Sequence, residues 1–200
     1  MQAPPRQDYG VVLADPPWHF RTWNDQNDTK SARRHYDLLE LNNICALPVN
    51  DWLAPNSALF IWATWPTIFH TRQVIEAWGF RYSGLAWEWF KFNPLSGKAA
   101  FGLGYGTRKN LEPCLLALKG RPKLNSRSER DWLSAPRREH SRKPDEQYSR
   151  IEAMYCGPYL ELFARHGHAG WDAWGDEAPA SVPPVSAMAR DNALHEGVFG

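Results

Sequence analysis

Residues 11–18 read VVLADPPW, an apolar run that turns directly into an acid, two prolines and a large aromatic residue. The apolar run predicts a buried strand over 9–14. The two prolines end that strand, because each lacks a backbone N–H and has its φ fixed, and each holds the preceding residue extended. Ligands of open α/β sheets bind at the carboxyl ends of strands, so this turn is a candidate ligand site.

The tetrapeptide at 15–18 has the features of an amine-binding site. Asp15 supplies a charged acceptor, the Pro16 carbonyl supplies a second one, and Trp18 offers a flat face on which a planar heterocycle can stack. Acceptors on both N–H bonds of an aromatic amine favour a more tetrahedral nitrogen, whose lone pair can attack the methyl group of a sulfonium. The alternative is that Pro16 and Pro17 only stop the strand and that Trp18 belongs to the core.

The composition narrows the class of protein. The chain has 200 residues, enough for one domain with a real core, and its formal net charge of +1 does not by itself indicate nucleic acid. Cys45, Cys114 and Cys156 lie far apart, which argues against a disulfide framework or a zinc site and favours a reducing cytoplasm. We find no signal peptide and no apolar run as long as a membrane helix. No histidines have metal-ligand spacing, so we expect no metal.

The order of the predicted elements indicates an α/β domain with a largely parallel sheet. After the first strand, apolar runs predict further strands over 57–64, 81–92, 111–119, 132–138, 159–165 and 171–174. Helices are predicted over 41–47, from Pro66 to Gly79 and from Pro144 to Gly157, with prolines at the first positions of the last two. We expect residues 1–177 to form the domain and 178–200, rich in Ala, Pro and Ser, to be a flexible tail.

Further segments, taken with the Asp-Pro-Pro-Trp turn, resemble one known family in order and spacing. They read HYDLLE at 35–40, GLGYGTRKNLEP at 102–113, HSRKPDE at 140–146, ELFAR at 161–165 and GWDAWGDE at 170–177. Over residues 9–177 the chain resembles the MT-A-seventy family of adenine-N6 methyltransferases. The resemblance implies a Rossmann-like, S-adenosylmethionine-dependent methyltransferase fold that is circularly permuted, with the target-amine motif first and the cofactor strand last.

The resemblance also implies S-adenosyl-L-methionine as the cofactor and a set of residues that bind it. We expect Lys143 to meet the cofactor carboxylate, Arg165 to meet that carboxylate or a ribose oxygen, and Asp176 and Glu177 to accept ribose hydroxyls. The alternative for Lys143 and Arg165 is that they are solvated surface charges. The expected cofactor-binding residues are Asp15, Lys143, Glu161, Phe163, Arg165, Gly167, His168, Asp176 and Glu177.

Nucleic acid is the expected partner. Residues 119–143 are markedly basic and could follow a phosphate backbone, although a solvated loop fits the composition equally well. Enzymes that act on a base extrude it or use single strands, and stack it on flat side chains. We expect Trp18 and Tyr36 to stack and Asn110 and Glu112 to contact the adenine edge. The expected substrate-binding residues are Trp18, His35, Tyr36, Arg108, Lys109, Asn110 and Glu112, and the catalytic residues are Asp15, Pro16, Pro17 and Trp18.

These features predict an enzyme that transfers a methyl group from S-adenosyl-L-methionine to the N6 amine of adenine in DNA. RNA is the alternative substrate, and a catalytically silent, nucleic-acid-binding partner subunit is the alternative class. The intact tetrapeptide at 15–18 argues against a catalytically silent subunit. Methylation of a glutamine amide is disfavoured because that class has Asn where this chain has Asp15. We expect a cytoplasmic monomer or homodimer with no membrane contact.

Overall fold

A computed structural model describes residues 3–18, 41–102, 106–139 and 142–176. The expectations for His35, Tyr36, Glu177 and the tail at 178–200 lie outside the described residues. Within the described residues, no helix is both long and apolar enough to cross a membrane.

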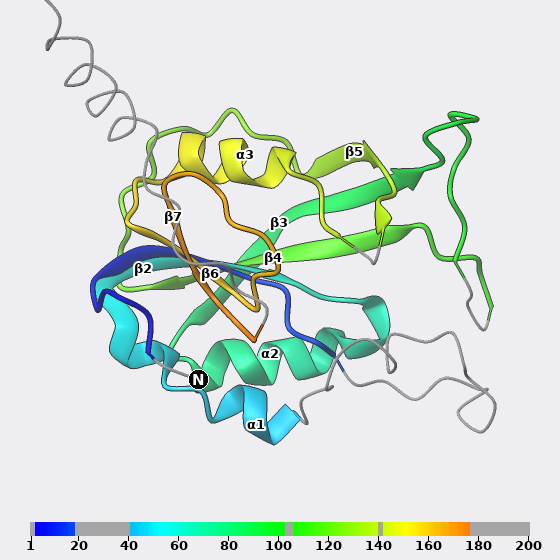
Figure 1. Ribbon diagram of the computed structural model, residues 1–200. Coiled ribbons are helices and arrows are strands. Elements are labelled where there is room, and N and C mark those ends of the chain that lie inside the picture. Colours follow the sequence, from blue (N-terminus) through cyan, green and yellow to red (C-terminus); the bar gives the residue numbers. More distant parts are fainter. Residues whose placement is uncertain (1–2, 19–40, 103–105, 140–141, 177–200) are drawn as a thin grey trace, which may run out of the picture.

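One seven-stranded sheet organises the chain, in the order β5-β3-β4-β2-β1-β6-β7 (Figure 1). Its strands are β1 Tyr9–Ala14, β2 Leu53–Trp62, β3 Arg81–Phe92, β4 Leu111–Lys119, β5 Trp132–Pro136, β6 Tyr159–Leu162 and β7 Trp171–Trp174. Every neighbouring pair is parallel except those of β4, which runs antiparallel to β2 and to β3. The prediction of a mostly parallel α/β sheet is confirmed, and β6 ends at Leu162, three residues before the predicted end.

The helices lie on both faces of this sheet. α1 (Leu41–Cys45) and α2 (Ile68–Ala77) cover one face, and α3 (Glu146–Met154) covers the other (Figure 1). Two 3-10 turns, η2 Val49–Trp52 and η3 Trp65–Thr67, lead into β2 and α2. The predicted start at Pro66 therefore falls in a 3-10 turn, which Thr64 and Thr67 cap before the α-helix begins.

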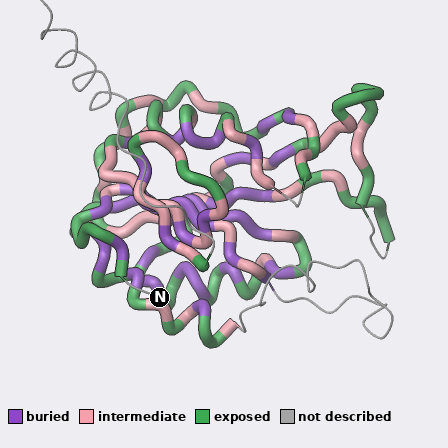
Figure 2. The backbone as a smooth tube through the Cα atoms, in the orientation of Figure 1, coloured by how far each residue is buried: buried purple, intermediate pink, exposed green. Residues whose placement is uncertain are grey.

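Two apolar clusters fill the layers above and below the central strands, which Figure 2 shows as the buried middle of the chain. Side chains along β2 alternate between the two faces: Leu59 and Ile61 pack toward α2, whereas Phe60 and Trp62 pack toward α3. On the α2 face Val74, Ile75 and Trp78 complete the cluster, and all are fully buried. On the α3 face the partners include Trp87, Trp89, Tyr148 and Ile151.

The direction of the strands gathers polar residues at one edge. The parallel strands β1, β2 and β6 end at the same edge, so Asp15, which follows β1, lies beside Trp62 at the end of β2. Because β4 is antiparallel and its Cys114 pairs with Trp62, the first residues of β4, Glu112 among them, lie at this edge as well. The sheet thus assembles a site from the ends of three strands and the beginning of a fourth.

We expect Leu59→Ala to destabilise the fold by about 2–5 kcal/mol, because the removed methyl groups leave a cavity between β2 and α2. Leu59 is fully buried in the central strand β2, whereas Leu95 is 97% exposed. Urea unfolding measures both changes, with Leu95→Ala as the matched control that should leave stability within about 0.5 kcal/mol of the parent. Equal stabilities for the two variants would contradict the packing described for this strand.

Candidate active site

A cavity of about 290 Å³ opens at the carboxyl edge of β1, β2 and β6, beside the beginning of α3. Seven of the residues expected to bind the cofactor line it, namely Asp15, Lys143, Glu161, Phe163, Arg165, Gly167 and His168. Leu13, Trp62, Arg142, Asp145, Gln147, Tyr148 and His166 complete the lining. The cavity therefore joins both acids and bases to aromatic rings, as a ligand with charged and flat parts requires.

Asp15 and Lys143 form an ion pair at the C-terminal end of β1. The Lys143 ammonium donates to both carboxylate oxygens of Asp15, at 2.9 and 2.8 Å, and lies 5.5 Å from the centre of the Trp62 ring. The Lys143 side chain is only 11% exposed. The partner of Lys143 in this structure is thus a carboxylate of the protein, where the sequence led us to expect the carboxylate of a cofactor.

The ion pair belongs to a row of four alternating charges. Lys143 also lies 3.6 Å from Glu112, and Glu112 in turn pairs with Lys91 at 2.6 Å. Burial opposes the charge on Lys143, but Asp15 and Glu112 outweigh it, so the pKa of Lys143 is raised. Burial likewise opposes the charge on Glu112, yet Lys143 and Lys91 hold its pKa below the ordinary value. Both shifts favour the charged forms of Lys143 and Glu112, the two groups in the middle of the row.

Trp18 lies in the core and does not offer an open face. It is 9% exposed, packs in the cluster on the α2 face, and donates its indole N–H to the Trp62 carbonyl at 3.0 Å. Its backbone N–H donates to the Pro16 carbonyl at 2.8 Å, which leaves that oxygen one lone pair for a ligand. The expected stacking of a base on Trp18 does not agree with this burial, and the alternative interpretation of Trp18 as a core residue fits the structure.

Glu161 lies in the cavity without a cation. Within the described residues it makes no ion pair, and its contact is the hydroxyl of Tyr148, which donates to Oε2 at 2.9 Å. Burial raises the pKa of Glu161 to about 7, with the charges of Asp15 and Asp145 adding to the effect and the Tyr148 bond opposing it. The Tyr148 ring stacks flat on His168, with ring centres 3.8 Å apart. This wall of the cavity is consequently a carboxyl group framed by two aromatic rings.

The turn after β6 carries backbone strain beside the cavity. Phe163 has a φ of 61°, a left-handed conformation that is uncommon for a residue other than glycine. The following backbone is packed against Gly175, where an added Cβ would lie 3.0 Å from the Ala164 nitrogen, and the Ala164 N–H donates to the Trp174 carbonyl. Strain held in place by neighbouring backbone is found at ligand sites, and here it turns the chain so that Arg165 and Gly167 line the cavity.

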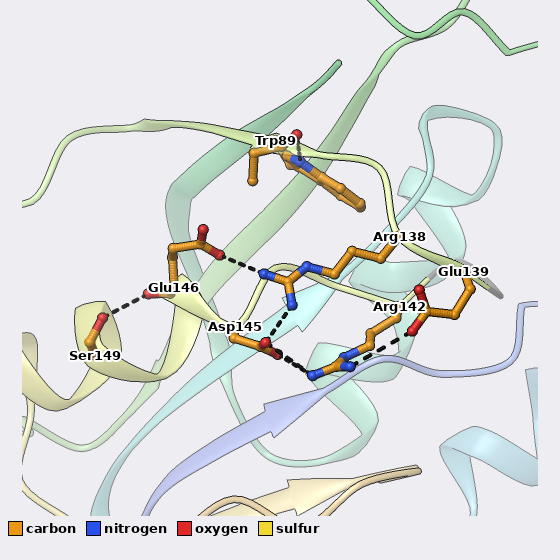
Figure 3. Close-up of polar contacts among 8 residues, drawn as sticks. Trp89, Arg138, Glu139, Arg142, Asp145, Glu146 and Ser149 are labelled. Carbon is orange, nitrogen blue, oxygen red and sulfur yellow. Dashed lines mark hydrogen bonds and ion pairs between the residues drawn. The ribbon is translucent and has the colours of Figure 1, made fainter. Parts of the chain in front are cut away.

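The basic segment before α3 is tied to that helix by ion pairs. Figure 3 shows Arg138 between Asp145 and Glu146, and Arg142 between Asp145 and Glu139. Arg142 donates to both oxygens of Asp145, at 2.9 and 3.0 Å. Part of the positive charge predicted to follow a phosphate backbone is therefore already neutralised by the helix start.

Other expected residues lie outside this cavity. Arg108, Lys109 and Asn110 belong to the connection between β3 and β4, which projects from the sheet (Figure 1), and none of them lines the cavity. Arg108 and Lys109 are exposed, as is Asp176, which follows β7 and does not line it either. Among the described residues, no group of three or more His, Cys, Asp and Glu could hold a metal ion.

Sequence reasoning missed several residues that build the site. Trp62 is fully buried, yet its indole N–H donates to Gln147 at 2.7 Å and its ring lies against the Lys143 ammonium. Gln147 is a buried polar residue on the helix face that packs on the sheet, and a glutamine among apolar helix positions was the available signal. Tyr148 packs in the apolar cluster on the α3 face, and its hydroxyl donates to Glu161.

Asp15 thus lies at a charged cavity at the carboxyl ends of β1, β2 and β6, where the ligands of α/β enzymes bind. A match to the MT-A70 (MT-A-seventy) family covers residues 9–177. The chain belongs to this family of adenine N6-methyltransferases, whose members use S-adenosyl-L-methionine.

Three relatives illustrate how the chain is related to longer proteins. It is similar to the type II methyltransferase M.MunI of a Mycoplasma species, with 32% identity across 88% of this chain and 80% of the relative. Its identity to an Arabidopsis thaliana N(6)-adenosine-methyltransferase MT-A70-like protein is 31%, across 92% of this chain but 29% of the relative. The N6-methyladenosine RNA methyltransferase MTA1 of Cryphonectria parasitica is 27% identical across 84% of this chain and 51% of the relative.

The carboxyl of Glu161 should make stability depend on pH. With a folded-state pKa of about 7, above its ordinary value, Glu161 binds its proton more tightly in the folded chain. Its ionisation therefore removes up to about 3 kcal/mol of stability as the pH rises from about 5 to 8. Glu161→Gln abolishes this loss, so the variant should gain stability relative to the parent over that range in urea unfolding. A parent–variant difference that is the same at pH 5 and pH 8, as we expect for the exposed control Glu76→Gln, would contradict the assignment.

Proposed function

We propose that this protein methylates the N6 amine of adenine in DNA, with S-adenosyl-L-methionine as the methyl donor. The observation that carries the proposal is the Asp15 carboxylate, which Lys143 holds at the edge of the cavity. The fold that we propose is the circularly permuted one, since the strand with the amine-binding turn comes first and β6, the strand of the cofactor side, comes near the end.

In this proposal Asp15 and the Pro16 carbonyl accept the two hydrogens of the target amine. The acceptors let the nitrogen lone pair leave the ring system and point into the cavity. Lys143 orients Asp15, so that the carboxylate faces the positive charge that develops on N6 during transfer. Fixed groups aimed at developing charge are worth far more than the same groups in water.

The cavity fits the charged parts of the cofactor, which supplies a methyl group on a sulfonium when it is bound. Glu161 is the acid of the cavity that makes no ion pair among the described residues, so we assign it to the cofactor ammonium. We assign Arg165, on the turn after the strained Phe163, to the cofactor carboxylate. Lys143 is reassigned from that carboxylate to the positioning of Asp15, because both Asp15 oxygens already accept hydrogen bonds from its ammonium.

We favour DNA over RNA as the substrate because this chain is similar in length to the type II methyltransferase. The chain spans 80% of the type II methyltransferase, but only 29% of the Arabidopsis protein named for N(6)-adenosine. RNA remains the second candidate, since one relative is named as an RNA methyltransferase. The silent-subunit alternative is disfavoured, because the Asp15–Lys143 pair keeps the amine-binding carboxylate intact. The three cysteines are free, which fits the reducing cytoplasm that we propose as its location.

Asp15→Asn tests the acceptor role directly. The amide keeps one acceptor oxygen but lacks the charge, and we expect methyl transfer to fall by about 10²–10³-fold. The measurement is transfer of labelled methyl from the cofactor to DNA and RNA oligonucleotides, with N6-methyladenine identified by mass spectrometry. Asp8→Asn, which changes an exposed acid just before β1, is the matched control. Full activity of Asp15→Asn, or methyl incorporation at a position other than adenine N6, would refute the proposal.

Glu161→Gln tests the cofactor assignment. The parent should bind the cofactor less tightly as the pH falls below 7, by up to about tenfold per unit, because the ammonium requires the ionised carboxylate. The variant should bind more weakly at pH 8 and lose this pH dependence, whereas its affinity for oligonucleotides should not change. Calorimetry with the cofactor alone measures both quantities, with Glu76→Gln as control. Parent-like affinity of Glu161→Gln across this pH range would assign Glu161 to a structural role.

A further inference from the structure

A second cavity, of about 190 Å³, lies where β3, β4 and β5 meet their connecting segments. Glu112 lines this cavity, and its ion-pair partner Lys143 lines the first one, so that pair stands between the two. The floor is Trp89, which is buried and donates its indole N–H to the Ala135 carbonyl at 3.0 Å. The residues that we assign to the amine and the cofactor do not line this cavity, although it adjoins the row of charges that ends at Asp15.

Phe101 stands at the rim of this second cavity as an exposed ring on a fixed backbone. The side chain is 67% exposed. The residue before it is held by a bond from the Ala100 N–H to the Lys91 carbonyl at 2.8 Å, and the residue after it forms a bridge with Lys109. A large ring that is presented to solvent at low conformational cost is a feature of nucleic-acid stacking surfaces.

Two of the three basic residues that line the second cavity form ion pairs with carboxylates, and the third forms none with a described residue. Lys91 pairs with Glu112, and Arg138 pairs with Asp145 and Glu146 (Figure 3). Arg137 makes no ion pair with any described residue, although its backbone N–H is fixed by the Phe92 carbonyl at 2.9 Å. Arg137 is exposed, and an arginine with a fixed backbone and no carboxylate partner among the described residues suits a phosphate group.

We propose that this second cavity binds the nucleotide adjacent to the target adenine, with its base stacked on Phe101 and its phosphate on Arg137. The proposal rests on the proposed function, which places the target amine at Asp15. A strand that delivers its adenine there passes the Glu112–Lys143 pair, and the neighbouring nucleotide then lies at the rim formed by Phe101. Stacking of this kind tolerates any base, so the subsite contributes affinity and register.

Oligonucleotides that lack one base test the stacking. The probes are single-stranded DNA with one target adenine, intact or with an abasic residue on the 5′ or the 3′ side of it. For the parent, the abasic residue on one of the two sides should lower kcat/KM by about 5- to 150-fold. Phe101→Ala should lower kcat/KM on the intact probe to the same extent and should not respond further to that abasic residue. Phe101→Trp should restore the parent pattern.

Binding measurements provide readouts that do not require turnover. A 5-iododeoxyuridine next to the target adenine should crosslink to Phe101 on irradiation, as located by mass spectrometry. Arg137→Gln should reduce the slope of log affinity against log salt by about 0.7, the value for one lost phosphate contact on a single strand. Phe69→Ala and Arg81→Gln change an exposed phenylalanine on α2 and an exposed arginine at the start of β3, and should leave kcat/KM and the salt slope unchanged.

Each outcome supports or overturns the subsite. If Phe101→Ala lowers kcat/KM relative to the parent by the same factor on the intact probe and on the abasic probe, the ring only supports its loop and the proposal fails. It would also fail if the parent ignored both abasic residues, or if the crosslink mapped elsewhere with no change in the salt slope. Absence of any adenine methylation by the parent would instead refute the proposed function, while the crosslink and salt slope would still report on binding at Phe101.

Discussion

The ammonium of Lys143, buried between the carboxylates of Asp15 and Glu112, is the interaction on which the site depends. It joins the end of β1, the beginning of β4 and the segment before α3, which are far apart in the sequence. Taking these charges out of water is costly, and the cost is met only because every charge of the row has an opposite neighbour. Loss of the ammonium would leave two carboxylates facing each other with Lys91 alone to compensate.

The antiparallel orientation of β4, which reverses the direction of one strand in the sheet, makes this interaction possible. In a sheet with all strands parallel, the beginning of β4 would lie at the opposite edge from Asp15, and Glu112 could not reach Lys143. Because β4 is antiparallel to both neighbours, its first residues reach the carboxyl edge of β1 and β2. The same reversal puts the Glu112–Lys143 pair between two cavities, the one lined by Lys143 proposed for the cofactor and the one lined by Glu112 proposed for a neighbouring nucleotide. A ligand on either side therefore meets the same charged pair.

The sequence predicted the elements better than the contacts. Apolar runs and prolines located all seven strands, because local patterning and turn chemistry determine where a strand can exist. Lys143 was identified as a site residue, but its partner was not, since the carboxylates that meet it come from residues 128 and 31 positions earlier in the chain. Trp18 was assigned to a ligand because it follows the prolines, yet a tertiary contact to Trp62 buries it. Periodicity along one element does not report which groups another element brings to it.

The buried position of Trp18 shows how the turn that we propose to bind the amine is held in place. Its indole N–H is bonded to the end of β2 and its backbone N–H to the Pro16 carbonyl, so the residues after β1 are fixed at their far end. Lys143 fixes the near end by binding both oxygens of Asp15. Two prolines stiffen the few bonds between these points. Acceptors that are held in this way need little reorganisation when charge develops on an amine, which is the condition under which electrostatic stabilisation of a transition state is strongest. The tryptophan therefore contributes by holding the acceptors still, and an anchor has to be buried to do so.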